Sequence, residues 1–430
     1  MAYPIAERLE KRHISSKLVE LRKHYKLSMV ERRKRALERL VETLEFARSN
    51  VPYYRDLFST TKFEPDKIRS DLSYLNDIPA LTKDIILEQG TRLLSQPLEQ
   101  VKHHTCKTGG STGLSCVIYY DDAAADYSSA VILYARGSVG NHKYQPELHF
   151  ACRFPDAAKP KWPSREDFKC FAMNRSNIFF DRIDDEGLEE IWQSLKRHKP
   201  FMIHAHPSTV YALACYVERK YGDGKVFDIF ESSGELLESY MRKTISRVLN
   251  CQVVNRYGLA ELGVMAYELN GQEGELQVLE SEGWPESLLI EGAEGGEEEL
   301  VFTGFRNRLM PLIRYRTGDM AKVEERENGF FLTNVVGRIH DLVPINGVTH
   351  ATHYVQDVLD HCVGGIQEFQ IDLRTSPPTL KIVPEITANT DEVRGKIEGF
   401  WKNGFNVQFV RHDDFIRVGR HAKFRHVVHL

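Results

Sequence analysis

The sequence lacks the features that mark secreted, membrane-spanning or nucleic-acid-binding proteins. Its seven cysteines are scattered and form no C-x-x-C pair, which is typical of reduced thiols and not of a disulfide framework or a zinc ribbon. No apolar run approaches the roughly 20 residues that a membrane helix needs, and the N-terminal "MAYPIAERLEKRH" lacks the apolar stretch of a signal peptide. A formal net charge of −4 gives no electrostatic reason to bind nucleic acid or an anionic membrane. We therefore expect a cytoplasmic protein with neither partner; homodimerisation is left open.

The composition is that of an ordinary globular protein. Hydrophobic residues make up 42% of the chain and charged residues 27%. A chain of 430 residues is too long for one small core, so we expect at least two domains.

One helix is evident near the N-terminus, in "SMVERRKRALERLVETLEFARSN" (28–50). Ser28 with Glu31 fits a capping box. An apolar face is predicted from the helical spacing, and it comprises Val30, Leu37, Leu40, Val41 and Leu44. We expect the opposite, Arg/Lys-rich face to be solvated.

Strand-like and helix-like segments then alternate. "CVIYY" precedes a helix-like segment at 122–136, "PFMIHAH" precedes "STVYALACYVERKYG", and "CQVVNRYG" and "ELVFTGF" indicate further strands. This alternation predicts an α/β fold with mixed and parallel sheets. The acidic "IEGAEGGEEELVF" (290–302) is expected to contain a turn between strands.

The pattern restarts near residue 338. Helix-like 352–361, strand-like 366–372 and 379–383, and helix-like 389–402 follow. We expect a large domain at 1–337 and a small α+β domain at 338–430.

The stretch "TGGSTG" (108–113) suits a polyphosphate. Glycines let backbone N–H groups approach a ligand closely, and hydroxyls add donors or a metal contact. The stretch is not a P-loop, since no Gly-Lys-Ser/Thr closes it. Alone it is a weak signal, because such loops are more often plain turns.

Three further segments strengthen that signal: "VNRYGLAELGV" (254–264), "PLIRYRTGDMA" (311–321) and "VGRIHDLVPINGV" (336–348). Together with "TGGSTG" they resemble, in order and spacing, the motifs of the adenylate-forming superfamily of acyl-CoA synthetases, luciferases and nonribosomal adenylation domains. The phenylacetate–CoA ligase-like branch is most similar, through "RSNVPYYRDLF" (48–58), "IPALTKDII" (78–86) and "PLIRYRTGD".

The resemblance implies an ATP-dependent acid ligase. A carboxylate attacks the α-phosphorus of ATP, pyrophosphate leaves, and the thiol of CoA then displaces AMP from the acyl-adenylate. Such chemistry needs positioning and charge neutralisation. ATP, Mg²⁺ and CoA are therefore the expected cofactors and co-substrate. The expected substrate is an aromatic or other small carboxylic acid, and CoA-thioester formation is the simplest outcome.

The resemblance also implies the nucleotide-binding residues. The phosphates would be held by Thr108, Gly109, Gly110, Ser111, Thr112 and Gly113. Glu261 would bind Mg²⁺, Tyr257 and Gly258 would border the adenine, and Asp319 would accept the ribose hydroxyls. The resemblance also assigns Arg338 to the ribose or phosphate side of ATP, and Ser233, Gly234 and Glu235 either to the adenine or to the lining of the acid pocket. The family usually has Thr before the Glu; Ala260 stands there and removes one hydrogen bond to the α-phosphate.

The C-terminal domain of the family is mobile and turns about a hinge residue, which matches His340. A lysine near the C-terminus serves adenylation, and Lys423 in "VGRHAKFRHVVHL" (418–430) matches it, with Arg420 as a rival. The acid pocket would include Tyr127, His206 and Val264, each of which could equally be a core-packing residue. Some branch members carry a Cys/His zinc site; Leu269 and Gln277 occupy those places, so we predict no structural zinc.

Two alternatives stay open. The adenylate could be transferred to an amine, a carrier-protein thiol or another small nucleophile. Ala260, His340 and the imperfect lysine tail also allow a non-catalytic nucleotide-binding homologue.

Overall fold

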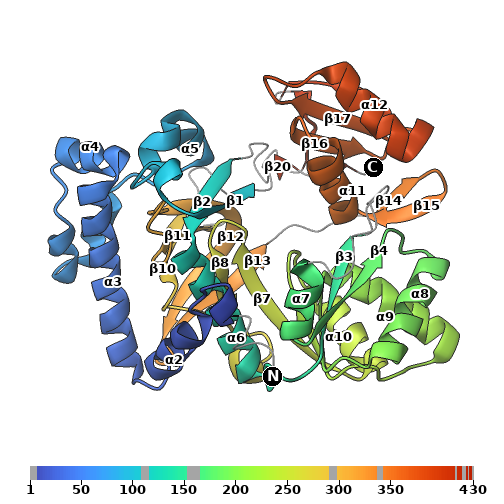
Figure 1. The fold of residues 1–430 in the computed structure, drawn as a ribbon, viewed down its shortest axis with the longest axis horizontal. Coiled ribbons are helices and arrows are strands. Elements are labelled where there is room, and N and C mark those ends of the chain that lie inside the picture. The colour runs from blue at the N-terminus through green and yellow to red at the C-terminus, as the bar shows by residue number, and fades with distance from the viewer. Residues whose placement is uncertain are drawn as a thin grey trace. The chain divides into compact units, whose positions relative to one another are not determined.

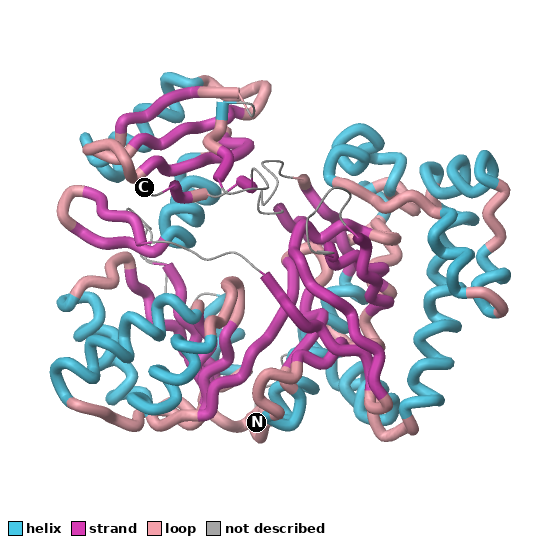
Figure 2. Tube along the Cα trace, turned by 180° about the vertical axis from the view of Figure 1, so that it is seen from behind, coloured by secondary structure: helices cyan, strands magenta, loops and turns pink. Residues whose placement is uncertain are grey.

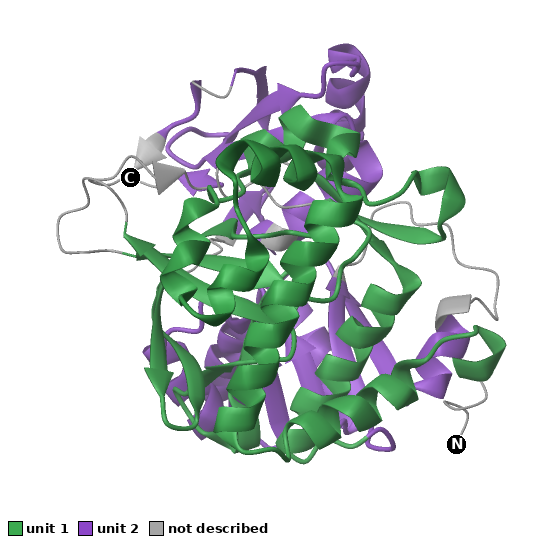
Figure 3. Ribbon diagram, turned by 90° about the vertical axis from the view of Figure 1, so that its left-hand side faces the viewer, with its two compact units in different colours: residues 1–109, 115–142, 255–336 green, residues 110–114, 143–254, 337–430 purple. Residues whose placement is uncertain are grey.

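The computed structural model describes residues 7–107, 116–152, 165–289, 298–336, 342–411, 414–418, 423–424 and 426–428. The chain divides into two compact units, coloured separately in Figure 3. Unit 1 comprises residues 1–109, 115–142 and 255–336, and unit 2 comprises 110–114, 143–254 and 337–430. The last segment of unit 1 ends at residue 336 and the last segment of unit 2 begins at residue 337, beside the predicted boundary. The division into domains 1–337 and 338–430 stays a prediction.

Unit 1 combines N-terminal helices with an antiparallel sheet (Figure 1). Its helices are α2 (Ile14–His24), α3 (Met29–Asn50), α4 (Pro52–Thr61), α5 (Lys83–Gln89) and α6 (Asp122–Ser138). Its strands include the hairpin β1 (His103–Lys107) and β2 (Val117–Asp121). The sheet strands are β7 (Gln252–Leu259), whose first three residues are counted with unit 2, β8 (Gly263–Tyr267), β9 (Leu276–Val278), β10 (Gly283–Leu289), β11 (Glu298–Gly304), β12 (Tyr315–Arg326) and β13 (Gly329–Val336). They are ordered β10-β11-β12-β13-β9-β8-β7.

Helix α3 confirms the predicted start and corrects the predicted faces. Ser28 caps the helix, and both bonds of its capping box with Glu31 are present. Leu40, Val41 and Leu44 of its apolar face are buried, whereas Val30 was wrongly placed there, since it is 80% exposed at the helix start. The Arg/Lys-rich face is not wholly solvated either, because Arg32 is buried against Glu280, at a distance of 2.8 Å.

Unit 2 begins with a parallel sheet of the predicted α/β type. Its strands are β3 (Glu147–Cys152), β4 (Arg175–Phe180), β5 (Met202–Ala205) and β6 (Ile229–Ser232), ordered β6-β5-β3-β4. Its helices are α7 (Arg165–Ala172), α8 (Asp185–His198), α9 (Pro207–Tyr221) and α10 (Ser239–Leu249). Residues of α8, α9 and α10 form one apolar core with the strands, and Figure 2 shows these helices (cyan) beside the strands (magenta).

The C-terminal residues of unit 2 form an α+β arrangement with a core of their own. Its elements are β14 (Leu342–Ile345), β15 (Val348–Ala351), α11 (Thr352–Val358), a π-helical turn (Leu359–Val363), β16 (Ile366–Asp372), β17 (Thr379–Pro384), α12 (Thr390–Trp401) and β18 (Asn406–Phe409). Three two-residue strands complete it, namely β19 (Arg417–Val418), β20 (Lys423–Phe424) and β21 (Val427–Val428). The main sheet is ordered β18-β17-β16-β21. The segments predicted from 352 to 402 are thus found with their expected types.

Candidate active site

Two tyrosines join the motifs that carry the predicted carboxylates. The hydroxyl of Tyr257 in β7 donates to Oδ2 of Asp319 in β12, at 2.8 Å. The hydroxyl of Tyr315 in β12 donates to Oε1 of Glu261, in the turn between β7 and β8, at 3.0 Å. Each motif therefore holds the acid of the other, and we call these four residues the crossed tyrosine–acid pairs. Tyr257, Glu261 and Asp319, predicted separately, lie together in unit 1.

Glycine makes the turn that carries Glu261 possible. Leu259 pairs with Gly263 across the β7–β8 hairpin, so residues 260–262 form its tip. A Cβ on Gly258 would lie 2.3 Å from the carbonyl oxygen of Gly263, much closer than atoms tolerate. The absence of a side chain at Gly258 thus allows the two strands to approach each other and keeps Glu261 at the hairpin tip. Ala260 is exposed there.

The segment around Asp319 is fixed by hydrogen bonds to β11. The Thr317 hydroxyl donates to the carbonyl oxygen of Leu300 at 2.7 Å and accepts the Asp319 N–H at 3.2 Å. Gly318 has φ of +77°, a left-handed conformation that favours glycine, and its N–H donates to Oε1 of Glu299 at 3.0 Å. Nε of Arg316 lies 2.8 Å from Oε2 of the same carboxylate. Arg316 therefore orients Glu299, which in turn holds the Thr-Gly-Asp turn.

The electrostatics connect this cluster with the end of β1. Burial, followed by the negative charge of Asp319, raises the pKa of Tyr257 well above its ordinary value, so its hydroxyl stays a donor. Burial, followed by the charge of Glu261, raises the pKa of the Cys106 thiol to about 11. Cys106 is one residue from the end of β1, so this strand ends near Glu261. The predicted phosphate loop, Thr108 to Gly113, follows directly but lies outside the described residues.

In unit 2 the structure brings together His206 and the segment after β6. Gly234 has φ of +85°, and a Cβ there would lie 2.6 Å from Nε2 of His206. The Glu235 carboxylate accepts the N–H of Ser208 at 3.0 Å and its hydroxyl at 2.9 Å. Because Ser208 lies in the first turn of α9, Glu235 stabilises the start of that helix. Ser233 lies in the same segment and is half-buried.

The other two residues predicted to bind the acid are in unit 1. The hydroxyl of Tyr127 in α6 donates to Oε2 of Glu20 in α2 at 2.8 Å. The guanidinium carbon of Arg306 lies 3.7 Å from the centre of the Tyr127 ring. Val264 in β8 is only 1% exposed. The contacts of Tyr127 and the burial of Val264 are what structural residues would also show. An acid-binding role for either residue stays a prediction.

The structure describes only some of the residues predicted to act in the C-terminal region. Arg338, His340 and Arg420 lie outside the described residues. The backbone of Lys423 is described and belongs to β20, which pairs antiparallel with β19.

Three residues that shape the site were not predicted from the sequence: Tyr315, Thr317 and Arg314. A signal existed for the first two, because the period of two along a strand places Tyr315, Thr317 and Asp319 on one face. The Arg314 side chain is 4% exposed and pairs with Glu286 at 3.0 Å. Its guanidinium also donates to the backbone of 75–78, so it anchors the N-terminal part of unit 1 beside β12.

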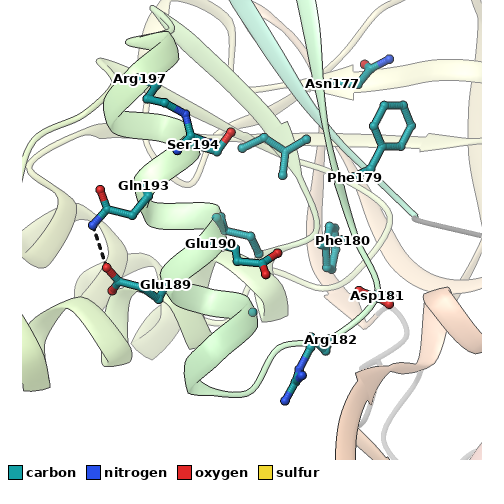
Figure 4. Close-up of a pocket in the computed structure, with 13 residues that line it drawn as sticks. Asn177, Phe179, Phe180, Asp181, Arg182, Glu189, Glu190, Gln193, Ser194 and Arg197 are labelled. Atoms are coloured by element: carbon teal, nitrogen blue, oxygen red, sulfur yellow. Dashed lines mark hydrogen bonds between the residues drawn. The ribbon is translucent and has the colours of Figure 1, made fainter.

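A separate groove of about 460 Å³ lies between β4 and α8 (Figure 4). None of the predicted site residues lines it. Its charged side chains include Arg182, which is paired with Asp184, and Glu189, which accepts from Gln193 at 2.6 Å. These local pairs explain the groove's polar lining, and we assign it no part in the chemistry.

No helix in the part of the chain that the structure describes is long and apolar enough to cross a membrane. Within those same ranges, no group of three or more His, Cys, Asp or Glu side chains could hold a metal ion by itself. The predicted absence of zinc stays a prediction.

Known proteins with similar sequences were found, although no family model matches the chain. The protein CapK of Staphylococcus aureus is 24% identical over 321 residues, covering 71% of this chain and 68% of CapK. A phenylacetate–coenzyme A ligase of Escherichia coli is 27% identical over 326 residues, or 72% of each chain. The corresponding ligase of Aromatoleum evansii is 25% identical over 350 residues, covering 78% of this chain and 76% of that ligase.

Solved structures show the same fold. A crystal structure of 2-hydroxyisobutyryl-CoA ligase with 2-HIB-AMP and CoA has a TM-score of 0.58 at 17% identity, covering 94% of this chain and 90% of that one. The same ligase in its postadenylation state with 2-HIB-AMP has a TM-score of 0.56 at 16% identity, with the same coverage.

Proposed function

We propose that this chain, which belongs to the adenylate-forming superfamily and its phenylacetate–CoA ligase-like branch, activates a small carboxylic acid with ATP and transfers the acyl group to CoA. The observation that carries the proposal is the crossed tyrosine–acid pairs. They bring the acids of two separate motifs into one cluster and fix both by hydrogen bonds. Fixed, partly desolvated carboxylates are what nucleotide binding without large reorganisation requires.

The reaction has two steps. An oxygen of the substrate carboxylate forms a bond to the α-phosphorus of ATP, and the bond to pyrophosphate breaks. The sulfur of CoA then bonds to the acyl carbon, and AMP leaves with the former carboxylate oxygen. The protein's task in both steps is positioning and stabilisation of phosphate charge.

Asp319 and Tyr257 hold the nucleoside in this proposal. A carboxylate accepts two hydroxyl donors, which suits the paired hydroxyls of a ribose. The Tyr257 hydroxyl donates to Oδ2 and so helps to fix the orientation of the Asp319 carboxylate. The Tyr257 ring, half-buried in β7, offers a flat surface beside the adenine.

Glu261 is the candidate Mg²⁺ ligand. Mg²⁺ is usually bound by one or two carboxylates together with substrate phosphates, not by a protein cage. A single half-buried carboxylate that receives one hydroxyl hydrogen bond fits that pattern. When bound, Mg²⁺ would neutralise charge on the phosphates. The hydrogen bond from Tyr315 would hold the Glu261 carboxylate in one orientation.

Lys423 completes the adenylation step in the proposal, as a cation beside the reacting phosphate. Thr108 to Gly113 and Arg338 would add phosphate contacts, His340 would be the hinge, and 233–235 with His206 would border the acid. CoA is the favoured acceptor, because several relatives are named as CoA ligases and a similar structure was solved with CoA. An amine or a carrier-protein thiol is the second candidate.

A panel of carboxylic acids tests the proposal. Aromatic, aliphatic and hydroxylated acids, phenylacetate among them, are incubated with ATP and Mg²⁺, and pyrophosphate release is measured with and without CoA. Mass spectrometry then identifies the product. We expect pyrophosphate release with a subset of acids and a CoA thioester from them.

The other outcomes separate the alternatives. Pyrophosphate release without a thioester points to another acceptor. ATP binding in calorimetry without pyrophosphate release from any acid points to a non-catalytic homologue. Absence of ATP binding refutes the ligase proposal altogether.

A further inference from the structure

The C-terminal sheet has a polar face that the proposed reaction does not yet use. Phe369 and Ile371 of β16 belong to the apolar core, so the alternation along a strand turns Glu368 and Gln370 to the opposite face. Lys381 of β17 is the register partner of Gln370 and faces the same way. Glu368 is nevertheless only 3% exposed and Gln370 0%. Something covers this polar face.

Part of that cover is the chain after β18. Nζ of Lys381 donates to the carbonyl oxygen of Asp414 at 3.1 Å. The Gln370 amide makes two bonds to one residue: its Nε2 donates to the carbonyl oxygen of Ile416 at 2.8 Å, and its Oε1 accepts the Ile416 N–H at 2.7 Å. The amide thus serves as a short strand partner for the backbone at 416. Phe415, between the two anchored residues, is 4% exposed.

The chain near the C-terminus is anchored to the same strand. Nε2 of His426 lies 3.0 Å from Oε1 of Glu368, and both side chains are buried. The N–H of Ile371 donates to the carbonyl oxygen of His426 at 2.6 Å. β21 then pairs in parallel with β16, with Val427 opposite Ile371.

The segment between these anchors carries Lys423. β19 and β20 form a hairpin in which Val418 pairs with Lys423 and Arg417 with Phe424. Ile416 immediately precedes β19, and His426 follows β20 by two residues. Both ends of the hairpin are therefore fixed to one strand by buried side chains.

We propose that Gln370, supported by the Glu368–His426 pair, is a positioning residue that sets where the hairpin presents Lys423. This inference rests on the proposed function, which gives Lys423 its role in adenylation. Lysine is a flexible side chain, so the position of its ammonium depends on where its backbone is held. Displacement of a reacting group by about 1 Å can lower a rate roughly 100-fold.

The test compares Gln370→Met with Gln408→Met. Methionine keeps the length of glutamine and removes both amide bonds. Gln408 lies in β18 of the same sheet and is exposed, so its replacement controls for loss of an amide in that sheet. Gln370→Glu is the conservative variant, because it keeps an acceptor for the Ile416 N–H and loses the donor. Thermal unfolding confirms that each variant folds.

Two measurements follow. Hydrogen exchange with mass spectrometry reports on the amides of 416–424. The two half-reactions are measured separately. Adenylation is followed as pyrophosphate exchange, with phenylacetate or with the panel acid that gave the fastest pyrophosphate release. Thioester formation is followed from the matching synthetic acyl-adenylate and CoA. Lys423→Ala is measured alongside.

For Gln370→Met we expect exchange at 416–424 to rise roughly tenfold, and kcat for adenylation to fall roughly 10- to 100-fold with little change in KM. Thioester formation should be retained, Gln370→Glu should lie between Met and wild type, and Gln408→Met should match wild type. General loss of structure would lower both half-reactions together, and that result overturns the inference.

Two further results would also overturn it, and they differ in meaning. If Lys423→Ala loses adenylation but Gln370→Met does not, the positioning role is wrong and the proposed function stands. If Lys423→Ala itself keeps full adenylation, the assignment of Lys423 is wrong, and the positioning role falls with it.

Discussion

Replacing Tyr257 by phenylalanine is the sharpest test of the crossed tyrosine–acid pairs. The change removes one oxygen atom and leaves the ring, so the packing of β7 is preserved. It deletes the 2.8 Å bond to Oδ2 of Asp319. A hydrogen bond to a charged group contributes roughly 1.5–3 kcal/mol. Because Asp319 is only half-buried, water can replace part of the lost bond. We therefore use the lower end of this energy range.

About 1.4 kcal/mol corresponds to a tenfold change in an equilibrium constant. We therefore expect Tyr257→Phe to raise the KM for ATP roughly tenfold in pyrophosphate exchange. The expected kcat stays within about twofold of wild type, because a ribose contact is made equally in the ground and transition states.

A matched control is available in Tyr221, whose hydroxyl also donates to a carboxylate, that of Glu189, at 2.9 Å. Tyr221→Phe should leave the KM for ATP unchanged. Tyr315→Phe should act differently from both, because it releases Glu261: it should raise the Mg²⁺ concentration needed for half-maximal rate.

The refuting result is specific. If Tyr257→Phe leaves the KM for ATP at the wild-type value, or lowers only kcat, the tyrosine does not orient a ribose-binding carboxylate. The raised pKa adds a check. Because the pKa of Tyr257 is raised in the folded protein, the hydroxyl stays protonated at pH values where an exposed tyrosine would ionise. The stability that this hydroxyl contributes is therefore complete below about pH 10 and is lost only as the pH rises further. The KM for ATP should show no tyrosine titration between neutral pH and that point.

Three other predictions concern stability and reactivity. Arg314→Met should lower the free energy of unfolding by roughly 3–5 kcal/mol in urea titrations, because it leaves Glu286 buried without its cation. This loss of stability should shrink on acidification, since burial raises the pKa of Glu286 and the neutral carboxylic acid needs no cationic partner. Gly258→Ala should destabilise the β7–β8 hairpin by roughly 1–3 kcal/mol, because its Cβ would lie 2.3 Å from the Gly263 carbonyl oxygen; unchanged thermal stability would contradict this. With its pKa raised to about 11, the Cys106 thiol should react with iodoacetamide near neutral pH more slowly than in urea-unfolded protein, as peptide mapping would show; equal rates would count against the raised pKa.

The fold was predictable where local signals were strong. The capping box at Ser28, the alternation of strands and helices, and the segments between 352 and 402 were all read correctly, because each depends on spacing within one element. The superfamily prediction agrees with the relatives, which include phenylacetate–CoA ligases, and the solved structures confirm the fold. Val30 failed because an apolar residue in the first turn of a helix can satisfy the spacing and still extend beyond the core.

The acidic residues of the candidate site were predictable from the sequence, but their hydrogen-bond partners were less so. Glu261 and Asp319 were found because their motifs are distinctive. Their partners Tyr257 and Tyr315 act through distances that no local pattern encodes, although the strand period offered a signal for Tyr315. Gln370 offered no such signal, since nothing in the sequence shows which backbone segment its amide will meet.

Charged residues on helix α3 show why such contacts escape a one-dimensional pattern. Arg32 occupies the polar side of an amphipathic helix, where solvation is the ordinary expectation. It is instead buried with Glu280, a residue 248 positions away that is itself 0% exposed. Burying either charge alone would be strongly unfavourable, so neither residue's position makes sense without the other. The same reasoning applies to the crossed tyrosine–acid pairs: sequence periodicity tells which side of an element is apolar, but only the tertiary fold determines which polar groups find partners.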